Sequence, residues 1–127
     1  MMNNKTVLIF DDDEDILEVC SIILTQHGFT IHTQINCEAI EEKISAASPD
    51  VILLDNQILP LGGIVAARSL AQSALHQHIP IVYFSANKDV ASLADAAGAH
   101  YFIEKPFELD DLVRIVEKAI SEYPANG

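Results

Sequence analysis

The sequence predicts an α/β fold in which helices cover both faces of a five-stranded parallel sheet. The strongest observation is the stretch 51–55, which is apolar up to a single carboxylate, Asp55, and is bounded by Pro49 and Pro60. An apolar run this short, without alternation, is typical of a strand buried on both faces. Similar runs alternate along the chain with segments of helical periodicity. That alternation builds a parallel sheet with right-handed crossovers.

The first three elements are expected to be a strand, a helix and a strand. Residues 6–10 form an apolar, β-branched run that leads into a cluster of acids. Asp13 suits the start of a helix, because a carboxylate there accepts free backbone N–H groups and complements the helix dipole. Apolar residues at helical spacing continue to His27, and Gly28 supplies the stop. Residues 29–34 then alternate at period two, which predicts a short strand nearer an edge.

The middle of the chain is expected to add two helices around the strand at 51–55. Asn36 can cap a helix through about Ala47, which Pro49 closes. After the turn-rich loop that follows Asp55, residues 64–76 are Ala-rich and mostly apolar, which predicts a helix.

The last third of the chain repeats the alternation of strand and helix. One apolar run ends in the hydroxyl residue Ser85, and a later run ends at the cationic residue Lys105. Between them, a helix of small residues is expected to stop at Gly98. The expected elements are strands at 81–85 and 100–104, helices at 87–97 and 107–122, and a loose tail at 124–127.

The compact arrangement of these elements is the flavodoxin-like, doubly wound sheet with strand order 2-1-3-4-5 and five helices. In such sheets ligands bind outside the carboxyl ends of the strands. Four of the five expected strand ends bring charge or a hydroxyl to that edge. The residues are Asp11, Asp12, Asp55, Ser85 and Lys105.

Composition narrows the class of protein. A chain of 127 residues fits one domain, spanning 1–127 with a core of about 5–122 and a short C-terminal tail. Its 19 acidic and 7 basic residues give a net charge of −12, which argues against direct nucleic-acid binding. No apolar run approaches the roughly 18 residues of a membrane span, and no secretory signal precedes the first strand, so we expect a cytoplasmic protein. Cys20 and Cys37 are expected to be buried thiols within helices.

The residues expected at the sheet edge suit phosphoryl transfer. Crowded carboxylates raise one another's pKa, and a bound cation relieves that repulsion. The oxygens of Asp11, Asp12 and Asp55 favour Mg²⁺ over a soft metal. Lys105 supplies a point charge and Ser85 a hydroxyl for phosphoryl oxygens. Asp55 is the candidate nucleophile that would form an aspartyl phosphate, while the other two acids hold the metal.

Four short blocks resemble the signature of the response-regulator receiver domain of two-component signalling. They are Phe10-Asp11-Asp12-Asp13-Glu14, Leu54-Asp55, Ser85-Ala86 and Lys105-Pro106-Phe107, in the family's order and at near-family spacing over almost the whole chain. The resemblance implies that Asp55 accepts a phosphoryl group from a sensor histidine kinase or a histidine phosphotransfer protein. It implies a Mg²⁺ site made by Asp11, Asp12, Asp55 and the Gln57 backbone carbonyl. It also implies that Ser85 and Lys105 contact the phosphoryl group, and that the Lys105-Pro106 peptide is cis.

Receivers of this kind also switch their surface when phosphorylated. The resemblance couples Ser85 to Phe102, the aromatic residue three positions before the lysine. We expect a stand-alone receiver that catalyses only its own phosphorylation and dephosphorylation. It would signal to a downstream partner protein, without contacting nucleic acid or a membrane. A homodimer formed on phosphorylation, through the face around Ile103 and the last helix, is an additional form to test.

The loop after the acceptor departs from the family pattern. The family usually places proline four residues after the acceptor, whereas here Pro60 stands five residues after it. Gly62 replaces an acid often found before the loop glycine, which corresponds to Gly63. Gln57 and Asn87 flank the expected path of a hydrolytic water, and amides could either orient or hinder that water.

Three other functions fit the sequence less well. A Mg²⁺-dependent phosphohydrolase using Asp55 usually needs a second acid two residues later, where Gln57 stands. A nucleotide or flavin site is disfavoured because the first strand-to-helix turn is acidic and lacks glycine. A receiver that binds partners without phosphorylation is disfavoured because all the chemical positions are filled.

For Phe102, the alternative to a switch residue is a plain core residue. The histidines are not at metal-ligand spacing.

Overall fold

The computed structural model describes residues 4–123 and contains the predicted parallel sheet. Its strands run in the order β2-β1-β3-β4-β5, so the flavodoxin-like, doubly wound topology is confirmed. The tail predicted at 124–127 lies outside the described residues. In chain order the elements are β1 (Thr6–Phe10), α1 (Glu14–Gln26), β2 (Thr30–Gln34), α2 (Ile40–Ala47), β3 (Val51–Asp55), α3 (Gly63–Ala71), β4 (Ile81–Ser85), α4 (Val90–Ala97), β5 (Tyr101–Glu104) and α5 (Leu109–Glu122).

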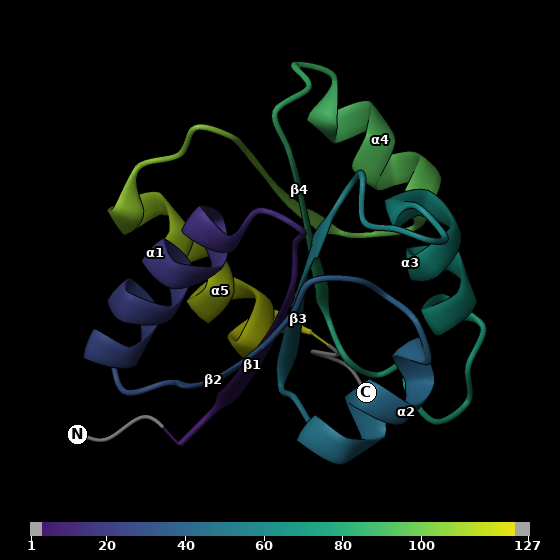
Figure 1. The fold of residues 1–127 in the computed structure, drawn as a ribbon, viewed down its shortest axis with the longest axis horizontal. Coiled ribbons are helices and arrows are strands. Elements are labelled where there is room, and N and C mark those ends of the chain that lie inside the picture. The colour runs from purple at the N-terminus through teal and green to yellow at the C-terminus, as the bar shows by residue number, and fades with distance from the viewer. Residues whose placement is uncertain (1–3, 124–127) are drawn as a thin grey trace.

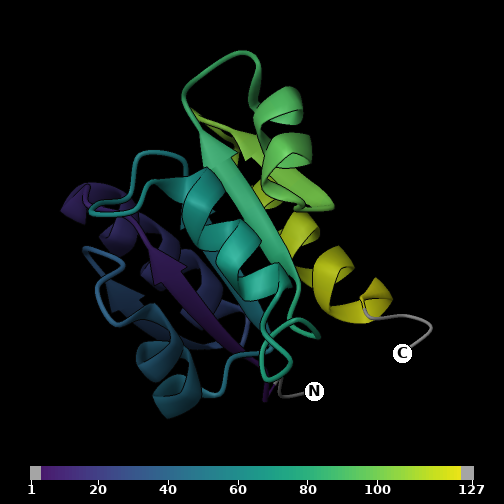
Figure 2. The ribbon, with the colours of Figure 1, turned by 90° about the vertical axis from the view of Figure 1, so that its right-hand side faces the viewer.

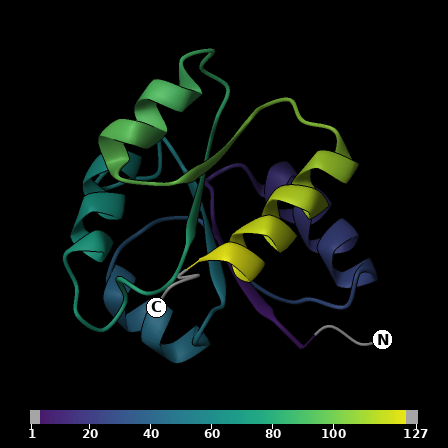
Figure 3. The same ribbon diagram turned by 180° about the vertical axis from the view of Figure 1, so that it is seen from behind.

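Helices cover both faces of the sheet, which makes three layers (Figure 1). Helices α2, α3 and α4 lie on one face, which is turned toward the viewer in Figure 2. Helices α1 and α5 lie side by side on the other face, as Figure 3 shows. The carboxyl ends of the strands point upward in Figure 1, so the loops that follow them gather at one edge.

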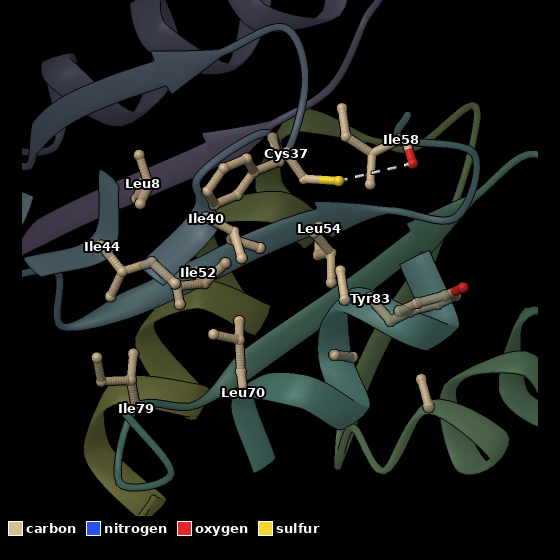
Figure 4. Close-up of a cluster of buried hydrophobic side chains, with 14 of the residues drawn as sticks. Leu8, Cys37, Ile40, Ile44, Ile52, Leu54, Ile58, Leu70, Ile79 and Tyr83 are labelled. Carbon is tan, nitrogen blue, oxygen red and sulfur yellow. Dashed lines mark hydrogen bonds between the residues drawn. The ribbon is translucent and has the colours of Figure 1, made fainter. Parts of the chain in front are cut away.

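The two helical layers enclose two apolar cores, one on each face of the sheet. Every residue of β3 is buried, as expected for an apolar run at the centre of a parallel sheet. Alternate residues of the central strands enter opposite cores. Leu54 contributes to the core beneath α2, α3 and α4 (Figure 4), while Leu53 contributes to the core beneath α1 and α5. The outer strands β2 and β5 are largely exposed, which explains their weaker apolar pattern.

The start of α2 differs from the prediction. The Asn36 side chain does not cap a helix, because its Oδ1 accepts a hydrogen bond from the Glu38 N–H at 3.0 Å and closes a turn. The helix therefore begins at Ile40. Cys37 lies in this turn and not in a helix, with its N–H donating to the Leu59 carbonyl at 2.8 Å. Asparagine forms such local turns as readily as helix caps, and the sequence does not distinguish the two.

The helices of the second half are also shorter than predicted. The helix expected at 64–76 ends at Ala71, and turns follow in which the Ser73 carbonyl accepts from His76 and Gln77. The helix expected from Asn87 begins at Val90, because Asn87 Oδ1 accepts from the Asp89 N–H at 2.7 Å.

The last helix begins two residues later than predicted. Phe107 precedes it and packs edge-on against Phe84, with ring centroids 6.4 Å apart. Glu108 has extended backbone, so α5 begins at Leu109.

Both cysteines are free and buried, as predicted. Cys20 lies on α1 against the core beneath α1 and α5, and Cys37 belongs to the opposite core. Among residues 4–123, none of the helices combines the length and apolar character that a membrane crossing needs.

Candidate functional site

The sheet delivers four polar side chains to its carboxyl edge. Asp55 and Ser85 are the last residues of β3 and β4, and Asp11 and Lys105 directly follow β1 and β5. Because β1, β3 and β4 are neighbours in the sheet, their ends meet in one cleft. Ten residues line it, namely Asp11, Asp12, Asp13, Asp55, Asn56, Gln57, Ser85, Ala86, Asn87 and Lys105.

The Lys105 ammonium lies between two buried carboxylates. Its Nζ is 2.6 Å from Asp11 Oδ2 and 2.8 Å from Asp55 Oδ1. The same ammonium lies 4.6 Å from the centroid of the Phe84 ring, at cation–π distance. Burial lowers the pKa of Lys105, but its hydrogen bonds to the two carboxylates outweigh burial and raise the pKa above its ordinary value. Lys105 is therefore a fixed positive charge beside both acids.

The acids form a cluster suited to a hard cation. Asp11 is fully buried and Asp12 is exposed, and each offers an oxygen within 4.8 Å of one from Asp55. Burial raises the pKa of Asp11 and the nearby charge of Asp55 acts in the same direction, whereas the hydrogen bond from Lys105 lowers it. A set of three carboxylates with one face open to solvent fits a divalent cation that prefers oxygen ligands.

The Asp55 carboxylate is oriented by two different contacts. Oδ1 accepts from Lys105, and Oδ2 accepts from the Gln57 N–H at 2.9 Å. The side chain is buried but lines the cleft. Both oxygens are therefore held in place within the cleft.

Ser85 lies beside this carboxylate, at the end of the neighbouring strand. Its Oγ is buried and accepts from the Asn87 N–H at 3.0 Å. The Ser85 carbonyl accepts a hydrogen bond from the Lys105 N–H at 2.8 Å, which joins the end of β4 to the start of the loop between β5 and α5. Gln57 and Asn87 are exposed at the rim of the cleft, where they were expected to flank an incoming water.

Phe102 lies on the solvent side of β5. Phe102 is 43% exposed, so the alternative interpretation of this residue as a plain core phenylalanine is wrong. It pairs in register with Tyr83 of β4, two residues before Ser85. Phe102 also lines a surface groove with Ile103 and residues of α5.

The loop after Asp55 is exposed at Leu59 and Leu61 but closely packed at Gly63. The Leu59-Pro60 peptide is cis, and so is the Lys105-Pro106 peptide, as the family resemblance implied. A Cβ added to Gly63 would lie 2.7 Å from the Tyr83 hydroxyl oxygen and 2.8 Å from the backbone of Asn56. Glycine is therefore required where this loop enters α3.

Two residues next to the site were not singled out from the sequence, Tyr83 and Asn56. The Tyr83 hydroxyl donates a hydrogen bond to Asn56 Oδ1. Burial and the charge of Asp55 raise the pKa of Tyr83 to about 12, so its hydroxyl remains a donor at neutral pH. A tyrosine in a strand of buried apolar residues was the available signal, because a buried phenol needs a hydrogen-bond partner.

Comparisons with known proteins agree with this fold. The response regulator receiver domain family matches residues 7–117. The DNA-binding transcriptional regulator NtrC of Escherichia coli (strain K12) is 31% identical over 124 residues, which make up 96% of this chain and 26% of NtrC. The chain thus spans about a quarter of that relative's length.

Solved structures of response-regulator proteins have a similar fold. A protein of Chloroflexus aurantiacus J-10-fl, described as a response regulator, superposes with a TM-score of 0.87 at 26% identity, covering 94% of this chain and 99% of the other. The receiver domain of NtrX from Brucella abortus has a TM-score of 0.81 at 28% identity, covering 91% and 98%. Since the family match extends over most of the described sheet and helices, this chain belongs to the response-regulator receiver domain family.

Proposed function

We propose that this receiver takes a phosphoryl group from phosphohistidine onto Asp55, with Mg²⁺, and then binds a downstream partner protein through an altered surface. The single observation that supports this most is the double contact of Lys105 Nζ with Asp55 Oδ1 and Asp11 Oδ2. It places a fixed cation between the carboxylates of Asp55, the proposed acceptor, and Asp11. Phosphoryl transfer depends on such positioned charge.

In the proposed reaction, a carboxylate oxygen of Asp55 attacks the phosphorus of the phosphohistidine. The new O–P bond forms as the P–N bond breaks, and the electron pair of that bond goes to the imidazole, which takes a proton from solvent. Lys105 then pairs with a phosphoryl oxygen in place of part of its present carboxylate contact. Ser85 Oγ, in the same cleft, turns to donate to another phosphoryl oxygen.

Asp11, Asp12, Asp55 and the Gln57 backbone carbonyl would hold Mg²⁺, which neutralises charge on the phosphoryl oxygens when bound. The fit rests on the three clustered carboxylates, which are the oxygen donors that this ion prefers. The chain's own catalysis would be limited to its phosphorylation and dephosphorylation.

The proposed output is a change of surface around Phe102. Movement of Ser85 toward the phosphoryl group would open space behind it for the Phe102 ring, which is now partly exposed. Such a change biases a two-state surface toward binding a partner. The donor would be a sensor histidine kinase or a histidine phosphotransfer protein, and the role fits the cytoplasmic location expected from the sequence. Size-exclusion chromatography with and without a phosphoryl analogue would test the homodimer.

Intact-protein mass spectrometry tests the acceptor chemistry. The protein is incubated with acetyl phosphate and Mg²⁺, beside the Asp55→Ala variant and a sample with chelator. We expect a gain of one phosphoryl group in the wild-type protein with Mg²⁺, and in neither control. No adduct, together with no Mg²⁺-dependent change in amide spectra on adding beryllofluoride, would contradict the proposed function.

A further inference from the structure

Tyr83 is a buried polar residue that the proposed reaction does not use. It lies on β4 with no exposed surface, within the core beneath α2, α3 and α4. Figure 4 shows its ring at the margin of this core, with the hydroxyl directed away from the labelled aliphatic side chains. That hydroxyl donates to Asn56 Oδ1, in the residue directly after the acceptor Asp55.

Asn56 is held at three points. Its N–H donates to the Phe84 carbonyl at 3.0 Å, and its carbonyl accepts from the Gly63 N–H at 2.8 Å. The third contact is the hydrogen bond from Tyr83 to its side chain. Two of the three contacts come from Tyr83 and Phe84, which are adjacent residues of β4. This strand therefore fixes the start of the loop that follows Asp55.

The packing around the Tyr83 hydroxyl leaves little freedom for the loop where it reaches Gly63. The Cβ that Gly63 lacks would lie 2.7 Å from the hydroxyl oxygen and 2.8 Å from the Asp55 carbonyl oxygen. The loop backbone therefore closes directly over the tyrosine. The Asn56 peptides connect Asp55 to Gln57, and the Gln57 N–H in turn holds Asp55 Oδ2 at 2.9 Å.

We propose that Tyr83 is a positioning residue of the phosphorylation site: through Asn56 it fixes the backbone between Asp55 and Gln57, and so tunes Mg²⁺ affinity and acceptance of the phosphoryl group. This inference rests on the proposed function. Tyr83 touches none of the reacting atoms, so its effect passes through the hydrogen bond to Asn56. Loss of one such bond corresponds to a change of about 3- to 10-fold in an equilibrium constant.

The test compares Tyr83→Phe with Tyr101→Phe. Each variant loses one hydroxyl, but the Tyr101 hydroxyl donates to Glu122 on α5 at 3.2 Å, away from the cleft. Mg²⁺ is titrated while amide spectra are recorded, and thermal midpoints are measured in chelator. We expect Tyr83→Phe to weaken Mg²⁺ binding by about 3- to 10-fold and to shift the Gln57 amide signal before Mg²⁺ is added. Tyr101→Phe should leave both the Mg²⁺ affinity and the Gln57 amide signal unchanged.

A double-mutant cycle tests whether the effect passes through Asn56. Asn56→Ala alone should weaken Mg²⁺ binding to a similar extent, and adding Tyr83→Phe should then change little. Wild-type affinity in Tyr83→Phe, or an undiminished loss in the Asn56→Ala background, would overturn the inference and leave the proposed function intact. A wild-type protein that binds no Mg²⁺ and gains no phosphoryl group would instead overturn the proposed function, and this inference with it.

Discussion

At the scale of single residues, Lys105 stabilises the buried negative charge of the site. The Asp11 side chain is 1% exposed and that of Lys105 is 15% exposed, so solvent screens their ion pair poorly. Removal of one partner from a buried pair leaves a charge without compensation, which costs more than a surface ion pair contributes.

Lys105→Met should therefore destabilise the protein in the absence of divalent cations. We expect the free energy of unfolding to fall by about 3 kcal/mol. Urea denaturation in chelator measures this change, with Lys88→Met as the control, because Lys88 is exposed. Equal stability of the two variants would show that the ion pair with Asp11 and Asp55 contributes nothing beyond an ordinary surface charge.

Cys20 is expected to be unreactive in the folded protein. Burial raises its pKa to about 12, and the nearby charge of Asp11 acts in the same direction. The thiolate that thiol reagents attack is therefore scarce at about pH 8, where an exposed thiol is partly ionised. In a Cys37→Ala variant, a disulfide reagent should label Cys20 slowly in buffer and rapidly in concentrated urea. Equal rates in the two conditions would contradict the buried placement of this thiol.

At the scale of elements, the strand ends were predictable, but only some of the helix starts were: α1 begins after Asp13, whose side chain caps it as predicted. The apolar runs end where the sheet meets solvent, so the positions of Asp55 and Ser85 follow from burial alone. Helix starts at Asn36 and Asn87 were predicted wrongly, because both side chains close local turns. The contact of Tyr83 with Asn56 could not be predicted, since it depends on the β3–β4 register and on the path of the following loop.

The turn after α3 is linked to α2 by His76. Its Nδ1 is 3.2 Å from Glu41 Oε1 and its Nε2 is 3.1 Å from Ser45 Oγ, while Ser73 Oγ donates to the same Glu41 oxygen at 2.8 Å. His76 is buried, so these bonds replace bonds to water that folding removes. Two helices on one face of the sheet are thereby joined at the end remote from the cleft.

Replacement of this histidine should weaken that connection. We expect His76→Ala to lower the free energy of unfolding by about 1–3 kcal/mol, because it removes a buried side chain together with its contacts to Glu41 and Ser45. His78→Ala, at an exposed position two residues later, should change stability by about 0.5 kcal/mol or less. Urea denaturation distinguishes the two, and a ranking in the opposite order would exclude this role for His76.

At the scale of the whole molecule, cation binding should be coupled to folding. The three carboxylates come from the ends of β1 and β3, which lie next to each other only in the folded sheet. A ligand that binds the folded state alone stabilises it by mass action. The acidic cluster therefore connects the occupancy of one cleft to the stability of the entire domain.

Mg²⁺ at about tenfold above its dissociation constant should raise the free energy of unfolding by about 1.4 kcal/mol. Asp12→Ala should lose most of this gain, because it removes one of the three clustered carboxylates. Asp95→Ala, which changes an exposed acid near the end of α4, should keep it. Thermal or urea unfolding with and without Mg²⁺ measures the difference, and the same gain in both variants would place the cation elsewhere.

The central claim is that Asp55, and neither Asp11 nor Asp12, carries the phosphoryl group. Borohydride reduces an aspartyl phosphate to homoserine, so the protein can be treated with acetyl phosphate and Mg²⁺, reduced, digested and mapped by peptide mass spectrometry. We predict homoserine at position 55, and none there when chelator is present. Homoserine at position 11 or 12, or none in a protein that has gained a phosphoryl group, would contradict the assignment of Asp55 as the acceptor.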